Sequence, residues 1–301
     1  MRYDCLIVGG GPAGLNAALV LGRAKRKVLL VDSGNPRNAV TRESHGFITR
    51  DGVKPEEFRQ LAHRELAAYP GIQVLHGKAV GIVKRGDMRF ELSTEEGGRY
   101  EGRTVVLATG LRDCLPPVPG LERYYGNSLF SCPYCDGWEQ RDRPLAVIAD
   151  TAEHAYHMAV MAYQWSADIA VCLNGGESLG DEQTEKLRSK GIAVYAQRIA
   201  SLRGEEGMLS AIVFDDGAAI ERTGGFVASK WEHPIDFAGM LGLSLNEHGG
   251  IAADDFGRTN VEGLYATGDA SLIVPAQLIA AAAGGSRAAM GVNAQLIHAD
   301  F

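Results

Sequence analysis

Several features that mark other protein classes are missing from this sequence. No apolar stretch reaches the roughly 18 residues that a membrane span requires, and the first residues enter a strand without a signal-peptide pattern. Basic residues form no stripe, and their densest run, at 23–27, is expected to be a solvated helix end. Together with a net charge of −7, these absences argue against a membrane protein and against binding to nucleic acid.

Cysteine is also sparse, and its number is odd. Five cysteines cannot all pair with one another, which argues against a secreted disulfide framework and favours a reducing cytoplasm. Cys132 and Cys135 form a Cys-x-x-Cys pair, which in that compartment is typical of a redox or metal site. Cys5, Cys114 and Cys172 form no second pair, so we expect no zinc and no other metal; Cys5 and Cys172 lie in apolar strands and should be buried.

Glycine, by contrast, is abundant, with 38 among 301 residues. This composition is typical of α/β proteins, in which glycines allow tight turns and close contacts between helix and sheet. The length predicts two domains rather than one. Apolar strand-type runs alternate with helical segments in two places, so we expect two Rossmann-like, three-layer α/β domains.

The domain boundaries follow from two features. A proline-rich segment at 115–120 is typical of a crossing between domains. The C-terminal part then returns to the first pattern, with a strand that ends in a Gly-Asp turn at 263–269 and a long Ala-rich helix at 277–297. The sequence therefore predicts a discontinuous first domain and an inserted second domain, at 1–114 plus 243–301 and at 115–242.

The start of the chain contains a complete dinucleotide-binding pattern. An apolar strand at 3–8 is followed by Gly-Gly-Gly-Pro-Ala-Gly at 9–14, a helix at 15–21 and a second strand at 28–31. Asp32 ends this second strand, where a carboxylate accepts the hydroxyls of a ribose. The pattern therefore predicts a site for the pyrophosphate and ribose of a dinucleotide.

Each small residue of the glycine turn has an expected role. Gly9 makes the tight turn, Gly11 lets the backbone approach the pyrophosphate, and Gly14 lets the helix pack on the strand. Pro12 and Ala13 belong to the same turn and are expected in the cofactor site, and the helix that follows has free N–H groups and a positive dipole end that favour phosphate.

The order of four motifs along the chain resembles the thioredoxin reductase family of small flavoproteins. The motifs are the glycine turn, Ala108-Thr109-Gly110, Cys132-Pro133-Tyr134-Cys135-Asp136-Gly137 and Ala266-Thr267-Gly268-Asp269, and they cover essentially the whole chain. The resemblance implies FAD rather than NAD in the first domain, and it implies a homodimer. It assigns Asp269 to the ribityl chain of FAD, and it adds to the flavin site the residues Ala108, Thr109, Gly110 and Gly268.

Four further residues are expected near the flavin. Ala276 and Gln277 open the last helix, whose N-terminus would stabilise an anionic reduced flavin. Asn38 and His45 belong to a polar segment that is expected to pass along the flavin. His45 is either a proton carrier or a structural histidine, and Gln277 is either a flavin contact or helix surface.

The resemblance also assigns the roles of the thiol residues. It implies that Cys132 exchanges with the partner, and that Cys135 faces the flavin. Asp136 stands where the family has the acid that protonates or deprotonates the exchanging thiol. A carboxyl group at a low-dielectric flavin face should have a raised pKa, which suits that task.

The second domain departs from the family pattern at its expected NADPH site. The strand at 146–148 leads into Ala149, Thr151 and His154 where the fingerprint has small residues. We expect the Cβ atoms of Ala149 and Thr151 to crowd the turn, and His154 to prevent close packing of helix on strand. The next strand ends in Leu-Asn-Gly-Gly at 173–176, without a basic cluster for the 2′-phosphate of NADPH or an acid for the ribose of NADH.

The sequence therefore predicts an FAD-dependent thiol–disulfide oxidoreductase that does not use NADPH efficiently. In the reductase direction, a ferredoxin or flavodoxin reduces the flavin, and Cys132 reduces a thioredoxin-like protein. In the oxidase direction, a small dithiol reduces the Cys132–Cys135 disulfide, and oxygen reoxidises the flavin. Flavin-dependent dithiol oxidases often carry His where this chain has Asp136. The alternatives are an NADPH-dependent thioredoxin reductase with a divergent site and a redox sensor without turnover.

Overall fold

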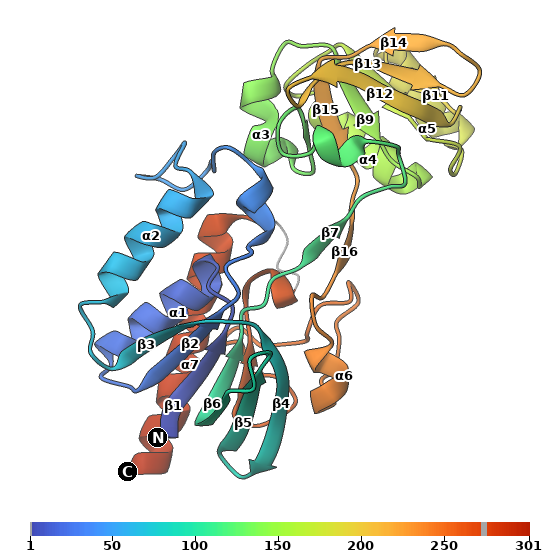
Figure 1. Ribbon diagram of the computed structural model, residues 1–301. Helices are drawn as coiled ribbons and strands as arrows, with labels where there is room; N and C mark the ends of the chain where they lie inside the picture. The colour runs from blue at the N-terminus through green and yellow to red at the C-terminus, as the bar shows by residue number, and fades with distance from the viewer. Residues whose placement is uncertain (1, 272–275) are drawn as a thin grey trace. The chain divides into compact units, whose positions relative to one another are not determined.

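The computed structural model describes residues 2–271 and 276–301 and divides the chain into two compact units (Figure 1). The first unit contains Met1–Ala39, Gly46–Arg112 and His233–Phe301. The second contains Val40–His45 and Asp113–Glu232. Apart from the short segment Val40–His45, the chain passes into the second unit after residue 112 and returns after residue 232, where the sequence-based prediction has 114 and 242.

The first unit is built on a mixed seven-stranded sheet of order β3-β2-β1-β6-β5-β4, with β17 also paired to β6. β1, β2, β3, β6 and β17 are parallel, whereas β4 and β5 continue the sheet in antiparallel fashion. The strands are β1 Arg2–Val8, β2 Val28–Asp32, β3 Ile72–His76, β4 Ala79–Gly86, β5 Arg89–Thr94, β6 Arg99–Leu107 and β17 Leu264–Ala266.

Alternating side chains of these strands form two cores. Cys5 and Ile7 of β1 pack with α1 Pro12–Arg23 and α7 Leu278–Asp300 on one face. Leu6 and Val8 pack on the other face, against the β4–β5 pair and α6 Phe237–Leu241. The unit also contains α2 Pro55–Leu66, the short 3₁₀ helix η3 Gly268–Ser271 and all but the last residue of the 3₁₀ helix η1 Arg37–Val40.

α1 and α7 lie side by side along the sheet, and small residues permit their close approach (Figure 1). A Cβ atom at Gly285 of α7 would overlap the carbonyl oxygen of Ala13 at the start of α1. Asn16 of α1 also donates a hydrogen bond to the carbonyl oxygen of Ala282 at 2.8 Å. The Ala- and Gly-rich composition of the last helix therefore holds the start of α1 in place.

The second unit has a parallel five-stranded sheet of order β11-β10-β9-β15-β8. Helix α4 packs on one face, and an antiparallel sheet, β12-β13-β14, covers the other. The strands are β8 Leu129–Phe130, β9 Leu145–Ile148, β10 Ile169–Cys172, β11 Ala193–Tyr195, β12 Ile199–Glu205, β13 Met208–Phe214, β14 Ala219–Glu221 and β15 Gly224–Val227. The helices are η2 Leu121–Arg123, α3 Pro133–Gln140, α4 Ala152–Ala162 and α5 Asp181–Ser189.

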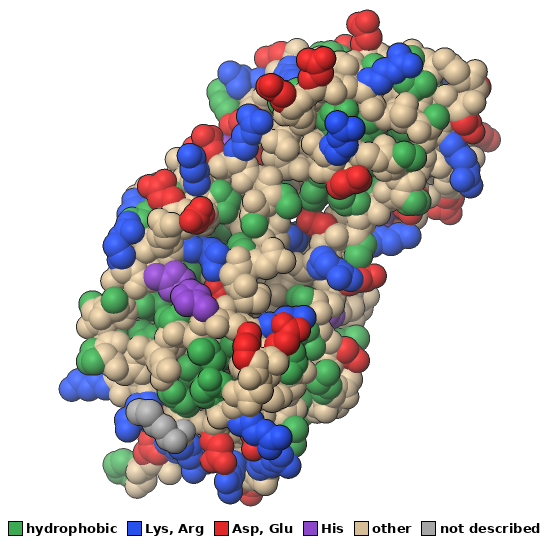
Figure 2. Space-filling model, viewed as in Figure 1, with side chains coloured by type: hydrophobic (Ala, Val, Ile, Leu, Met, Phe, Trp, Pro, Cys, Tyr) green, Lys and Arg blue, Asp and Glu red, His purple; other side chains and the backbone are tan. Residues whose placement is uncertain are grey.

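Both units therefore confirm the predicted α/β class. The two connecting segments, β7 Arg112–Cys114 and β16 Lys230–Glu232, pair as a two-stranded sheet. Across residues 2–271 and 276–301, the structure contains no helix with the length and apolarity of a membrane span. On the face seen in Figure 2, basic and acidic side chains are interspersed rather than gathered by sign.

Candidate active site

The second unit contains a disulfide between Cys132 and Cys135, at the start of α3. Cys132 is the residue before the first turn, Pro133 opens the helix, and the two cysteine Cα atoms lie 5.2 Å apart. The N–H groups of Cys135 and Asp136 both donate to the carbonyl oxygen of Cys132, at 3.1 Å. The pair is therefore held at a helix N-terminus, where the positive dipole end favours a thiolate once the disulfide is reduced.

Asp136 follows Cys135 directly and is also part of the first turn of α3. Burial raises the pKa of its carboxyl group from 3.8 to about 7, against the lowering effect of His45 and with a further rise from Glu139. An acid with a pKa close to neutral can both donate and accept a proton at physiological pH. Asp136 thus has a pKa that suits a proton donor or acceptor, and it is the next residue after Cys135 in the chain.

His45 belongs to the second unit, although the sequence leads to an expectation of His45 beside the flavin. Its Nε2 atom lies 3.7 Å from a carboxylate oxygen of Glu139 on α3 and 3.9 Å from one of Glu43. The imidazole also contributes to the electrostatics of Asp136. The structure therefore brings His45 to α3, the helix that begins at the disulfide. The role of His45 along the flavin stays a prediction.

The remaining cysteines differ from the Cys132–Cys135 pair. Cys5 and Cys172 are fully buried in strands, and this burial raises the pKa of each thiol to about 12. They are packing residues, as the apolar sequence around them predicts, because thiols with such pKa values remain protonated and unreactive. Cys114 is half-buried in β7.

In the first unit, the predicted flavin residues converge at one edge of the sheet. β2, β1, β6 and β17 are neighbouring parallel strands, and each predicted segment lies at or directly after the carboxyl end of one of them. These segments are Asp32 at the end of β2, the glycine turn after β1, Ala108–Gly110 after β6 and Gly268–Asp269 after β17. The carboxyl edge of a parallel sheet is where α/β proteins bind nucleotides.

The glycine turn has the shape that a pyrophosphate needs. Cβ atoms at Gly9 and Gly14 would overlap the carbonyl oxygens of Ala108 and Gly9, so both positions require glycine. A Cβ at Gly11, however, would meet nothing within 4 Å, which leaves open space at the start of α1. α1 has no side-chain cap and no acidic residue in its first turn, so its N–H groups can face an anion. These residues fit the diphosphate of FAD.

We expect Gly11→Ala to fold and to bind FAD at least about tenfold more weakly. The φ angle of −77° suits alanine, and the new methyl group meets only open space within the protein itself. In the FAD-bound protein, the methyl group would stand where the pyrophosphate approaches. Visible absorbance measures the FAD content and thermal unfolding checks the fold; Gly14→Ala, by contrast, should fail to fold. An FAD affinity equal to that of the wild type in Gly11→Ala would contradict this assignment.

Both acidic residues of this edge pair with arginines that the sequence interpretation missed. Asp32 is 5% exposed; it accepts bonds from the N–H groups of Gly10 and Gly34, each at 3.1 Å, and it pairs with Arg59 of α2. Asp269 pairs with Arg37 of η1 at 2.9 Å. No sequence pattern indicates these two ion pairs, because in each pair the acid and the arginine are far apart along the chain.

The other predicted flavin residues are also described. Asn38 is half-buried in η1, and Gln277 is the residue before α7, without a side-chain cap. Ala276 precedes it, directly after the undescribed residues. Helix α7 begins at Leu278, close to the predicted start of the last helix.

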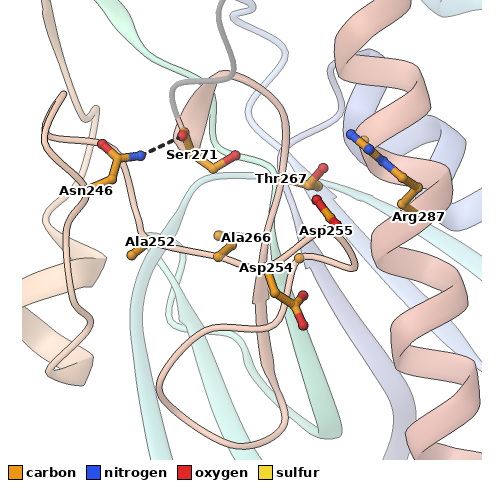
Figure 3. Close-up of a pocket in the computed structure, with 11 residues that line it drawn as sticks. Asn246, Ala252, Asp254, Asp255, Ala266, Thr267, Ser271 and Arg287 are labelled. Atoms are coloured by element: carbon orange, nitrogen blue, oxygen red, sulfur yellow. Dashed lines mark hydrogen bonds between the residues drawn. The ribbon is translucent and has the colours of Figure 1, made fainter.

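A separate cavity of about 270 Å³ lies in the first unit, between the segment after β16 and helix α7 (Figure 3). The side chains of Thr267, Asp255 and Arg287 border it. The Thr267 hydroxyl oxygen is buried, and it has no hydrogen-bond partner among the residues described. The described lining contains none of the predicted flavin residues and neither redox cysteine, so we do not assign the cavity to the candidate site.

The turn between β9 and α4 is the counterpart of the glycine turn in the second unit. Thr151 is the residue before the helix, yet its side chain makes no capping hydrogen bond. The expectation that His154 prevents close packing is wrong: His154 is exposed, whereas Ala155 and Ala159 are fully buried against the sheet. The helix presents its alanines to β9, and the divergence is therefore confined to the turn itself.

Comparisons with known proteins find relatives that match nearly the whole chain. Residues 3–286 match the family model of pyridine nucleotide-disulphide oxidoreductases. The chain is 33% identical to thioredoxin reductase sirT of Leptosphaeria maculans over 99% of this chain and 96% of that protein. It is 27% identical to the thioredoxin reductase of Helicobacter pylori, over 98% and 99%. A solved structure described as a putative thioredoxin reductase TrxB from Bacillus anthracis is 41% identical, with a TM-score of 0.96 and coverage of 99% and 100%.

Proposed function

Because the chain belongs to the pyridine nucleotide-disulphide oxidoreductase family, we propose that it exchanges electrons between FAD and the Cys132–Cys135 disulfide without using NADPH. The chain is an FAD-dependent thiol–disulfide oxidoreductase of the thioredoxin reductase type. The proposal adds to this class the residues that react and the exclusion of the nicotinamide. The observation that carries it is the disulfide at the start of α3 with the raised pKa of Asp136 beside it.

In the oxidase direction, the Cys132–Cys135 disulfide oxidises a dithiol substrate in two exchange steps. A thiolate of the substrate attacks Sγ of Cys132, the Cys132–Cys135 bond breaks, and Cys135 leaves as a thiolate. The second thiolate of the substrate then attacks the mixed disulfide, releases the substrate as a disulfide and leaves both cysteines reduced. Asp136 accepts a proton from an attacking thiol or returns one to a leaving thiolate. The two electrons of the substrate now reside in the cysteine pair.

The first unit supplies the cofactor site. When bound, FAD accepts or supplies the two electrons that the cysteine pair exchanges. Gly11 and the start of α1 would hold its diphosphate, and Asp32 would bind its ribose. Asp269 would bind the ribityl chain, and Arg37 holds that carboxylate in place.

The second unit supports exclusion of the nicotinamide. In the first unit, the corresponding turn has glycine at each position where backbone or ligand approaches. In the second unit, the same turn has Ala149 and Thr151, with Asp150 and Glu153 adding negative charge where phosphates would bind. After β10, the side-chain oxygen of Asn174 accepts a hydrogen bond from the N–H group of Ile199 at 2.9 Å. This oxygen therefore stabilises the loop rather than binding a ligand.

The partner is proposed to be a thioredoxin-like protein or a small dithiol. Tyr134 and Trp138 of α3 are each 65% exposed, and they offer an apolar surface beside the disulfide. The relatives described as thioredoxin reductases favour the protein partner. A ferredoxin or flavodoxin would supply electrons in that direction, and oxygen would accept them in the other. A homodimer in a reducing cytoplasm is part of the same proposal.

Anaerobic stopped-flow spectroscopy of the FAD-loaded protein tests the proposal. We expect a dithiol to bleach the flavin absorbance, whereas NADPH and NADH leave it unchanged at equal concentration. Readmission of oxygen then distinguishes an oxidase, which turns over, from a reductase, which awaits a protein partner. Rapid bleaching by NADPH would contradict the proposal and would identify a thioredoxin reductase with a divergent phosphate site.

A further inference from the structure

The start of α4 is occupied by a carboxylate of the chain itself. Oε2 of Glu177 accepts a hydrogen bond from the N–H group of Ala152, the first residue of the helix, at 3.0 Å. The first hydrogen bond within the helix runs from the N–H of Ala155 to the carbonyl oxygen of Thr151. Glu177 thus binds one of the N–H groups that a helix start leaves without a partner of its own. In a dinucleotide-binding turn, those groups face the pyrophosphate.

The backbone conformation of the loop after β10 places Glu177 at this position. Asn174 and Gly175 both have left-handed backbone conformations, with φ angles of 52° and 69°, which turn the chain back toward β9. The N–H group of Glu177 then donates to the carbonyl oxygen of Asp150 at 3.1 Å. A Cβ atom at Gly176 would overlap that same carbonyl oxygen, so only glycine fits between the two backbones.

The equivalent helix in the first unit shows the opposite arrangement. α1 has no side-chain cap, no acidic residue in its first turn and open space in front of Gly11. α4 has Glu177 as its cap, Glu153 in its first turn and Asp150 in the preceding turn. Asp150 forms an ion pair with Lys230 at 3.2 Å, so the positive charge of Lys230 is already balanced by a carboxylate of the protein. The first helix start can accept an anion, whereas the second already has one.

We infer that Glu177 is the specificity-determining residue that excludes nicotinamide dinucleotides, because its carboxylate takes the place of the pyrophosphate at the start of α4. This inference rests on the proposed function and gives it a structural cause. A diphosphate approaching Ala152 must displace Glu177 and overcome repulsion by it, since both groups carry negative charge and use the same N–H group. The missing glycines of the turn act separately, through the space that Thr151 fills.

Binding of inorganic pyrophosphate to the FAD-loaded protein tests the inference, because FAD then fills the site of the first unit. Calorimetry gives the affinity, and the backbone amide signal of Ala152 in a ¹⁵N-labelled sample gives the location. We expect Glu177→Ala to bind pyrophosphate at least about tenfold more tightly than the wild type, with a shift of the Ala152 signal. Glu185→Ala is the matched control, because Glu185 is an exposed acid on α5 paired with Arg188; its affinity should equal that of the wild type.

Glu177→Gln is a second variant that separates the loss of charge from a loss of structure in the loop. Glutamine keeps a carbonyl oxygen for the Ala152 N–H but carries no charge, so it should also gain affinity. The inference is overturned if neither variant gains affinity, if the Ala152 signal does not respond, or if the wild type already binds pyrophosphate at Ala152. Failure of the proposed function has a different signature, since NADPH would bleach the flavin of the wild type whatever the pyrophosphate result.

Discussion

Replacing Cys135 with serine is expected to abolish reduction of the flavin by a dithiol while FAD remains bound. Serine cannot form the disulfide with Cys132, so the substrate has no S–S bond to attack and its electrons have no route to the cofactor. The rate of flavin bleaching should fall by at least about 10³-fold, as for removal of other covalent catalysts. Anaerobic stopped-flow measurement with a dithiol gives the rate, and visible absorbance confirms the FAD content.

Two companion variants make this result specific. Cys132→Ser should lose exchange with the substrate to the same extent, because the disulfide needs both sulfur atoms. Cys114→Ser should react at the wild-type rate, since Cys114 is half-buried in β7 and lies outside the proposed chemistry. Near-normal bleaching in Cys135→Ser would remove the cysteine pair from the path of the electrons.

Asp136→Asn is expected to slow thiol exchange by about 10²–10⁴-fold near neutral pH, the usual contribution of a general acid or base. Asparagine preserves the size of the side chain but can neither donate nor accept the proton in exchange. The wild-type rate should also show an inflection near pH 7, because burial raises the pKa of this carboxyl group to about 7. A pH profile of the bleaching rate measures both effects, and the inflection should be absent from the variant.

The same substitution should change the pH dependence of stability. An aspartate in an unfolded chain has a pKa of about 3.9, so between that value and about 7 the folded protein retains a proton that the unfolded chain has lost. The free energy of unfolding contributed by Asp136 therefore falls as pH rises through this window. The Asp136→Asn variant has no such titration, so its stability relative to the wild type should increase from about pH 4 to about pH 8. Urea unfolding at several pH values measures this difference.

Asp142→Asn is the matched control for both measurements. Asp142 is exposed just beyond α3 and has a φ angle of 60°, a conformation that asparagine also adopts readily. Its rate and stability should match those of the wild type at every pH. If Asp136→Asn retained the full rate with an unchanged pH profile, the proton would have to be carried by another group, and His45 beside Glu139 would be the first to examine.

The sequence predicts the local features of the site well, because those features depend on neighbouring residues. The strand, glycine turn and helix at 3–21 form one continuous pattern, and the structure has each element. The Cys-x-x-Cys spacing likewise predicts the disulfide, since a helix start brings these two side chains together. A raised pKa for Asp136 is predicted from an expected low-dielectric flavin face; the structure has the pKa raised to about 7, with burial as the main cause.

Features that join distant parts of the chain were not predictable in this way. Glu177 reaches Ala152 only because Asn174 and Gly175 reverse the chain, and no spacing rule connects these positions. The exposure of His154 depends on how α4 is rotated on its sheet, which the packing of its buried alanines decides. The Gly-Gly pair at 175–176 was the one available signal, because a glycine pair after a strand indicates a close approach of two backbones.

The contact between Gly176 and the backbone of Asp150 bears on any redesign of the second unit, because it fixes the path of the chain that ends in Glu177. Loss of the Glu177 carboxylate would still leave Thr151 in the turn, and a glycine in place of Thr151 would still leave Glu177 at the helix. Removing the carboxylate alone would free only the N–H group of Ala152, whereas opening the whole turn to a dinucleotide would take changes at both positions together.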